Sequence, residues 1–201
     1  MRTVPGKGTE IVLFRWPRLN TWGARIHLSC HNAPPVADAP EMSKKKKDKK
    51  IEARLSPIHG NGVFATQAIK KGERIIRYKG TLRTHDEVDE EYGDDEENGH
   101  TFLFTLNDEY VIDANVSGNI ARWINHSCDP NCESEVEEDD KDRRHKDKVY
   151  ILALRDIRAG EELTYNYGIV LDEPHTAKLK KLWACRCGAK NCTGTMLQPK
   201  R

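Results

Sequence analysis

VIDANVSGNIARWINHSCDPNC, residues Val111–Cys132, constrains the fold more than any other stretch of this sequence. At its centre, Asn125, His126, Ser127 and Cys128 place an amide, an imidazole, a hydroxyl and a thiol in consecutive positions. These side chains are too polar for an ordinary hydrophobic core, and their aromatic and aliphatic neighbours are unusual for a plain solvent loop. We therefore interpret this stretch as part of a functional site.

Around it, short apolar segments rich in β-branched or aromatic residues alternate with Gly, Asn and Asp. This pattern predicts strands. The segments are Val63–Ala65, Arg74–Tyr78, Thr101–Leu106, Glu109–Asp113 and Val149–Leu154. Two others are expected to be short helices, Gly118–Ile124 and Lys178–Ala184. The sequence thus predicts a mostly β fold of several small sheets with few short helices.

Composition describes a polar chain with balanced charge. Its 201 residues are 37% hydrophobic and 32% charged, with a net charge of +1. This length suits one domain with an appendage. No apolar run approaches the roughly 20 residues that cross a bilayer, and we find no secretory signal pattern. We expect an intracellular monomer that does not enter membranes.

Residues 1–50 are predicted to be a poorly ordered basic leader. The Pro/Ala-rich stretch Ala33–Pro40 precedes KKKKDKK at Lys44–Lys50, a run that cannot bury itself. It is either a solubilising segment or a nuclear-import or nucleic-acid-binding arm, and we expect any direct contact with nucleic acid to use this run only. A further hypothesis is that translation starts at Met42 and that residues 1–41 are a mis-assigned extension.

Two charged segments interrupt the strand pattern and are predicted to be solvated loops. Asp86–Glu97 contains nine carboxylates and no basic side chain, and Glu133–Lys148 changes from acidic to mixed charge. The first segment, Asp86–Glu97, is either ordinary solvated surface or an acidic rim that attracts a cationic peptide.

Cysteine spacing predicts a metal site near the C-terminus. Cys185, Cys187 and Cys192 form a C-x-C-x4-C arrangement, which supplies three of the four thiolates of a tetrahedral zinc site. Cys128 is the obvious fourth ligand, and its use would tie the C-terminal segment to the Asn-His stretch. The alternative is disulfide pairing, which is uncommon in a protein without export signals.

Two further motifs are less specific. Gly60-Asn61-Gly62 allows a tight turn or a close approach of backbone to ligand. Tyr165 and Tyr167 would share one face of a strand, either as ordinary packing or as part of a site.

Four motifs follow one another along the chain: the Gly-x-Gly turn, Asn-His-Ser-Cys-x-Pro-Asn (125–131), Glu-Leu-Thr-Tyr-x-Tyr (162–167) and C-x-C-x4-C. Together they resemble the SET-domain family of protein lysine methyltransferases followed by its post-SET segment. The resemblance divides the chain into a leader (1–50), a SET domain (52–168) and a post-SET zinc-binding segment (169–197). It also implies a knot-like crossing of the C-terminal strand with the Asn-His segment.

Residue by residue, the resemblance implies an S-adenosyl-L-methionine site and a lysine channel. The residues expected against the cofactor are His59, Gly60, Asn61, Gly62, Phe102, Arg122, Asn125 and His126. Those expected at the methyl-transfer point and along the channel are Tyr167, Tyr78 and Tyr165. A tyrosine at 165, where the family alternates Tyr and Phe, favours mono- or dimethylation.

The chain departs from the family at three positions. Asn61 stands where a large aromatic is frequent, Phe102 where a cofactor-contacting tyrosine is common, and Asn166 where aspartate is usual.

The resemblance implies a substrate lysine in a histone-like or other basic protein. The expected location is the nucleus or chromosome in a eukaryote and the cytoplasm in a bacterium. Alternatives are a catalytically weak SET module that acts as a chromatin or protein-binding adaptor, and a zinc-stabilised nucleic-acid-binding protein.

Overall fold

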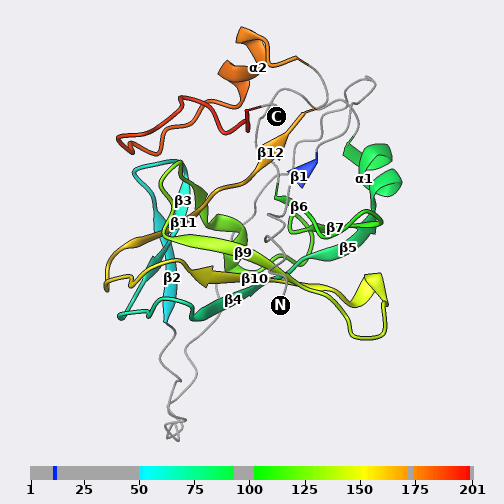
Figure 1. Cartoon of the computed structure of the whole chain (residues 1–201), viewed down its shortest axis with the longest axis horizontal. Coiled ribbons are helices and arrows are strands. Elements are labelled where there is room, and N and C mark those ends of the chain that lie inside the picture. The colour runs from blue at the N-terminus through cyan, green and yellow to red at the C-terminus, as the bar shows by residue number, and fades with distance from the viewer. Residues whose placement is uncertain (1–10, 13–49, 93–101, 172–173, 200–201) are drawn as a thin grey trace, which may run out of the picture.

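Figure 1 shows the protein as a computed structural model, which describes residues 11–12, 50–92, 102–171 and 174–199. Within these ranges the fold is mostly β, as predicted, with two α-helices among several small sheets. The first sheet has the order β2 (Ile51–Leu55), β3 (Asn61–Ala65), β11 (Glu162–Tyr165) and β8 (Asn125–His126). The second has the order β4 (Arg74–Tyr78), β10 (Lys148–Ala153) and β9 (Cys132–Glu137).

The third sheet has the order β5 (Thr81–Thr84), β7 (Tyr110–Asp113) and β6 (Leu103–Thr105). The fourth pairs β1 (Ile11–Val12) with β12 (Ile169–Val170). The helical elements are α1 (His85–Tyr92), α2 (Ala177–Leu182) and two 3-10 turns, η1 (Ile120–Trp123) and η2 (Arg144–Lys146). The five predicted strands and two predicted helical segments therefore coincide with observed elements, although their ends differ by up to a few residues.

The core lies where the first three sheets meet. In β10, residues 149, 151 and 153 are buried and alternate with partly exposed neighbours, which is the period expected of a strand with one face against a core. The core cluster also contains Tyr78 and Tyr165. Two of the predicted channel tyrosines are thus fixed by core packing.

A parallel pairing joins the two most specific motifs. Strand β8 pairs with β11, with Asn125 opposite Thr164 and His126 opposite Tyr165. The Asn-His stretch and the tyrosine motif are far apart in sequence and adjacent in the sheet. The predicted knot-like crossing concerns these same two segments.

The prediction that Asp86–Glu97 is a loop was wrong for its first half, which belongs to α1; residues 93–97 lie outside the described residues. Thr84 and Glu87 form a capping box: the Glu87 N–H donates to Thr84 Oγ1 (3.2 Å), and the Thr84 N–H donates to Glu87 Oε2 (2.9 Å). Val88 packs inward from the helix. The cap and the acidic first turn stabilise a helix that the acidic composition of this segment did not predict.

The prediction of a loop at Glu133–Lys148 was also wrong at its start, where β9 pairs with β10. Arg74 forms ion pairs with Glu135 (3.1 Å) and Glu137 (2.5 Å), and Lys148 pairs with Glu137 at 3.2 Å. Cross-strand pairing of opposite charges allows an acidic segment to form an edge strand.

Apart from β1 and Lys50, the predicted leader lies outside the described residues. Among the helices that the structure describes, none is long and apolar enough to cross a membrane.

Candidate functional site

A cavity of about 460 Å³ opens between the β-sheets and the C-terminal segment. Of the eleven residues predicted to bind the cofactor or act in catalysis, ten line it, all except Gly62. The wall also contains apolar residues that the sequence reasoning did not single out: Ile58, Leu103, Trp123, Ile169, Trp183 and Met196. Trp183 directly follows α2 and lies two residues before Cys185, the first cysteine of the C-x-C pair. This nearness to the predicted metal site was the sequence signal that could have identified Trp183 as a cavity residue.

Gly62 lies against Glu162 and Ser56, a contact that the sequence did not predict; its expected place against the cofactor stays a prediction. A Cβ at this position would lie 2.2 Å from Glu162 Oε1 and 2.9 Å from Ser56 Cβ. The missing side chain therefore makes room for the Glu162 carboxylate. Gly60, by contrast, has φ +47, and a Cβ added there would meet nothing within 4 Å, so its backbone conformation is what favours glycine.

Glu162 anchors Asn125, and sequence reasoning missed this role. The Asn125 amide Nδ2 donates to Glu162 Oε1 (2.9 Å), to the Asn61 carbonyl (3.0 Å) and to the His59 carbonyl (3.2 Å). Ser56 Oγ donates to the same Glu162 oxygen at 2.7 Å. These bonds fix the glycine turn against β8, which explains why both elements lie on one side of the cavity.

His126 connects the Asn-His stretch to the third tyrosine. Its Nδ1 accepts a hydrogen bond from the backbone N–H of Tyr167 at 3.1 Å. Burial lowers the pKa of His126 to about 4, so the imidazole is neutral near pH 7 and Nδ1 is free to accept. The His126 ring also meets the Tyr167 ring edge-on, with centroids 5.3 Å apart.

Three phenols converge on the cavity. The rings of Tyr165 and Tyr167 have centroids 4.9 Å apart, although β11 ends at Tyr165 and the predicted strand alternation does not continue to Tyr167. Tyr167 Oη donates to the Ile124 carbonyl (2.9 Å), and Tyr78 Oη donates to the Phe102 carbonyl (3.0 Å). Burial raises the pKa of all three phenols, so they remain neutral hydrogen-bonding groups.

Arg122 is held among aromatic rings in the cavity wall. Its guanidinium lies 4.4 Å from the centre of the Trp123 ring and 5.3 Å from that of Phe102, while Nη1 donates to the Ala114 carbonyl at 2.9 Å. Phe102 and Trp123 pack edge-to-face with centroids 4.9 Å apart. Cation–π contacts and one hydrogen bond therefore fix the position of this charge.

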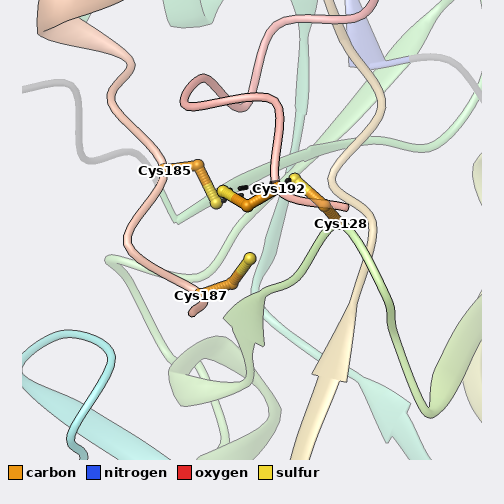
Figure 2. A group of neighbouring side chains, drawn as sticks. All are labelled: Cys128, Cys185, Cys187 and Cys192. Atoms are coloured by element: carbon orange, nitrogen blue, oxygen red, sulfur yellow. Dashed lines mark hydrogen bonds between the residues drawn. The ribbon is translucent and has the colours of Figure 1, made fainter. Parts of the chain in front are cut away.

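The four predicted cysteine ligands form a cluster, shown in Figure 2. Their Sγ atoms all lie within 4.8 Å of one another, and Cys128 Sγ is 3.8 Å from that of Cys185 and 4.0 Å from that of Cys192. Four thiolates around a zinc ion at about 2.3 Å would be separated by about 3.8 Å. A disulfide needs about 2.05 Å. The arrangement therefore fits a tetrahedral metal site, and these four cysteines are free thiols.

Local hydrogen bonding prepares one thiol for metal binding. Burial opposes ionisation of Cys187, but hydrogen bonds from backbone N–H groups lower its pKa to about 6. Because metals bind the thiolate form, this shift favours ligation by Cys187, whereas the pKa values of the neighbouring Cys185 and Cys192 are raised. Cys185 both belongs to the cluster and lines the cavity, so the cluster fixes the C-terminal wall of the cavity.

Comparison with known proteins agrees with this geometry. Residues 60–168 match the family described as SET domain. The chain is 40% identical over 139 residues to histone-lysine N-methyltransferase trr of Drosophila melanogaster and, over the same length, to histone-lysine N-methyltransferase 2D of Homo sapiens. Both alignments cover 68% of this chain, but only 5% and 2% of the respective relatives.

Among solved structures, the chain is similar to one described as ctPRC2 in an autoinhibited conformation bound to S-adenosylmethionine. The TM-score is 0.54 and the sequence identity 36%, covering 60% of this chain and 15% of that one. The fold and the site thus define a SET-type protein. The chain belongs to the SET-domain family.

Proposed function

We propose that this protein is a protein-lysine N-methyltransferase that uses S-adenosyl-L-methionine as methyl donor. The observation that carries the proposal is one cavity lined both by the Asn125–His126 pair and by the three phenols of Tyr78, Tyr165 and Tyr167. One group of side chains suits an amino-acid-bearing cofactor, and the other suits an alkyl amine. The SET-domain relatives named above are histone-lysine N-methyltransferases, which supports this interpretation.

The cofactor would supply an electrophilic methyl group on its sulfonium. The lysine ε-amine would accept this methyl in line, with S-adenosylhomocysteine as the leaving group. We assign the backbone of residues 59–61, together with Asn125 and His126, to hold the cofactor's amino-acid and adenosine parts. Apolar wall residues, Trp183 among them, would exclude water around it. Arg122, fixed over two rings, would add positive charge beside the site.

The residues around the amine position it rather than take its proton. Deprotonating a lysine with a pKa of about 10.4 near pH 7.5 costs about 4 kcal/mol, and desolvation beside a cationic donor reduces that cost. The phenols have raised pKa values and are neutral, so none is a strong base. Tyr167 Oη and the Ile124 carbonyl to which it donates would orient the amine, and the proton would leave through water.

We infer that the cysteine cluster binds one structural zinc ion. Four sulfur ligands close the coordination shell and leave no position for a substrate, as in structural sites. Its role is to fold residues 185–192 against Cys128, and so to complete the cavity.

The substrate is proposed to be a lysine in a histone or another basic protein, and the location chromatin in a nucleus. The support is the SET-domain similarity to histone-lysine N-methyltransferases and the acidic helix α1, which would favour a cationic partner. The monomeric state stays a prediction. The adaptor alternative is not favoured, because Asn125, His126 and Tyr167 are all present and line one cavity.

The test is methyl transfer by the full, zinc-loaded chain from labelled S-adenosylmethionine to a panel of histones and other basic proteins. Label should appear on a lysine, mapped by mass spectrometry, and Tyr167→Phe should reduce the rate about a hundredfold through poorer orientation of the amine. The circular dichroism spectrum should be unchanged in the variant. Absence of transfer to any lysine would refute the proposal.

A further inference from the structure

Strand β12 begins two residues after Tyr167, and the C-terminal segment occupies one of its two edges. Ile169 forms a parallel bridge with Leu197, and the N–H of Gln198 donates to the Ile169 carbonyl at 2.8 Å. A strand has only two hydrogen-bonding edges. One edge of β12 therefore remains for another chain segment.

The N-terminal strand β1 takes that remaining edge. Ile11 pairs in parallel with Ile169, and Val12 with Val170. Strand β1 also contacts β6, and we call its position against β12 and β6 the slot (Figure 1). The segment is distant in sequence from both strands.

The slot runs beside the proposed reaction site. Ile169 of β12 and Leu103 of β6 both line the cavity that contains Tyr165 and Tyr167. An extended peptide in this slot would pass the cavity and could direct a long side chain toward the phenols. Adding a strand to an exposed edge is a general mode of peptide recognition, in which main-chain hydrogen bonds supply the affinity.

We propose that residues 11–12 are an intrasteric occupant of the slot that the substrate peptide must enter, so that the N-terminal segment competes with substrate. This inference rests on the proposed function, because it assigns the slot to the substrate. The occupant blocks the slot without being modified there: no lysine lies between Lys7 and Lys44. A lysine-containing peptide must displace β1, which raises its apparent KM according to the fraction of chains in which β1 is docked.

The test uses the full chain with Val12→Pro, because proline removes a backbone donor and disfavours strand pairing. Ala37→Pro is the matched control, since it adds a proline to the same leader 25 residues after Val12 in the sequence. KM for a basic peptide substrate should fall about tenfold in Val12→Pro, equivalent to about 1.4 kcal/mol. Its kcat and the Kd for S-adenosylmethionine should not change. Ala37→Pro should behave as the unaltered chain.

Two further measurements report on the slot directly. A synthetic peptide of residues 8–18, which contains no lysine, should inhibit Val12→Pro competitively with the substrate peptide and not with the cofactor. Hydrogen exchange of the β12 amides should be faster in Val12→Pro and slow again when this peptide is added.

The outcomes separate the two proposals. Equal KM values for Val12→Pro and the unaltered chain, or inhibition by the 8–18 peptide that is not competitive with substrate, would overturn the inference and leave the methyltransferase assignment intact. Absence of methyl transfer by both chains would overturn the proposed function, and with it the assignment of the slot to substrate.

Discussion

Gly62→Ala tests whether this glycine makes room for Glu162, as the structure indicates, or for the cofactor, as the sequence suggested. The new Cβ would lie 2.2 Å from Glu162 Oε1, so the carboxylate must move. In moving, it would lose its hydrogen bonds from Ser56 Oγ (2.7 Å) and Asn125 Nδ2 (2.9 Å). The substitution should therefore act on stability first and on the cofactor site only through Asn125.

The expected loss in free energy of unfolding is about 2–3 kcal/mol. Hydrogen bonds to charged groups contribute about 1.5–3 kcal/mol each, but a displaced carboxylate regains part of that from water. Inserting a methyl group into a packed site independently costs about 1–3 kcal/mol. In a Glu162→Ala background the worst clash is absent, and the added cost of Gly62→Ala should fall to about 1 kcal/mol, from the remaining contact with Ser56 Cβ at 2.9 Å.

Urea unfolding of the four chains of this double-mutant cycle measures the coupling directly. Gly60→Ala is the control, because its Cβ meets nothing within 4 Å and only its φ of +47 opposes the change. It should cost about 1 kcal/mol and show no coupling to Glu162. If Gly62→Ala costs the same with and without Glu162, the steric explanation is wrong.

Three further predictions concern the product, the metal and a helix cap. Tyr165→Phe should raise the proportion of higher methylation states in product mass spectra, because a phenol hydroxyl would no longer hold water where additional methyl groups fit; an unchanged distribution would contradict this. Cys187→Ser should abolish stoichiometric zinc binding in metal analysis. It should also weaken S-adenosylmethionine binding at least tenfold in calorimetry, because Cys185 of the same cluster forms part of the cavity wall. Full cofactor affinity without zinc would count against a coupled site. Thr84→Ala should lower the free energy of unfolding by about 1 kcal/mol, with Thr84→Ser nearly neutral, since the hydroxyl caps α1; equal losses in both would exclude the capping explanation.

Much of the site was predictable, because it depends on rare combinations of side chains. The spacing of Cys185, Cys187 and Cys192, with Cys128 as fourth ligand, predicted a cluster that the structure contains. The parallel pairing of β8 with β11 explains why two motifs distant in sequence line one cavity. Short strands with β-branched residues were also identified correctly.

Other features depend on contacts that composition does not reveal. Glu162 resembles any acidic residue at the start of a strand until its partners Asn125 and Ser56 are known. The acidic residues of α1 and β9 suggested loops because acidic runs have weak intrinsic propensities for regular structure. In the structure, the capping box of α1 and the cross-strand ion pairs of β9 outweigh those propensities. Pairing of β1 with β12 links segments with no local signal for each other.

The central claim is that one cavity, completed by the C-terminal segment, holds the methyl donor beside the phenols. Calorimetric titration of S-adenosylmethionine into the zinc-loaded full chain tests it most directly, together with Trp183→Ala and Asn125→Ala. We predict one site per chain, with affinity reduced at least tenfold by each substitution, because both residues line the cavity, one from the C-terminal segment and one from β8. Absence of binding to the unaltered chain, or undiminished affinity in both variants, would contradict the account.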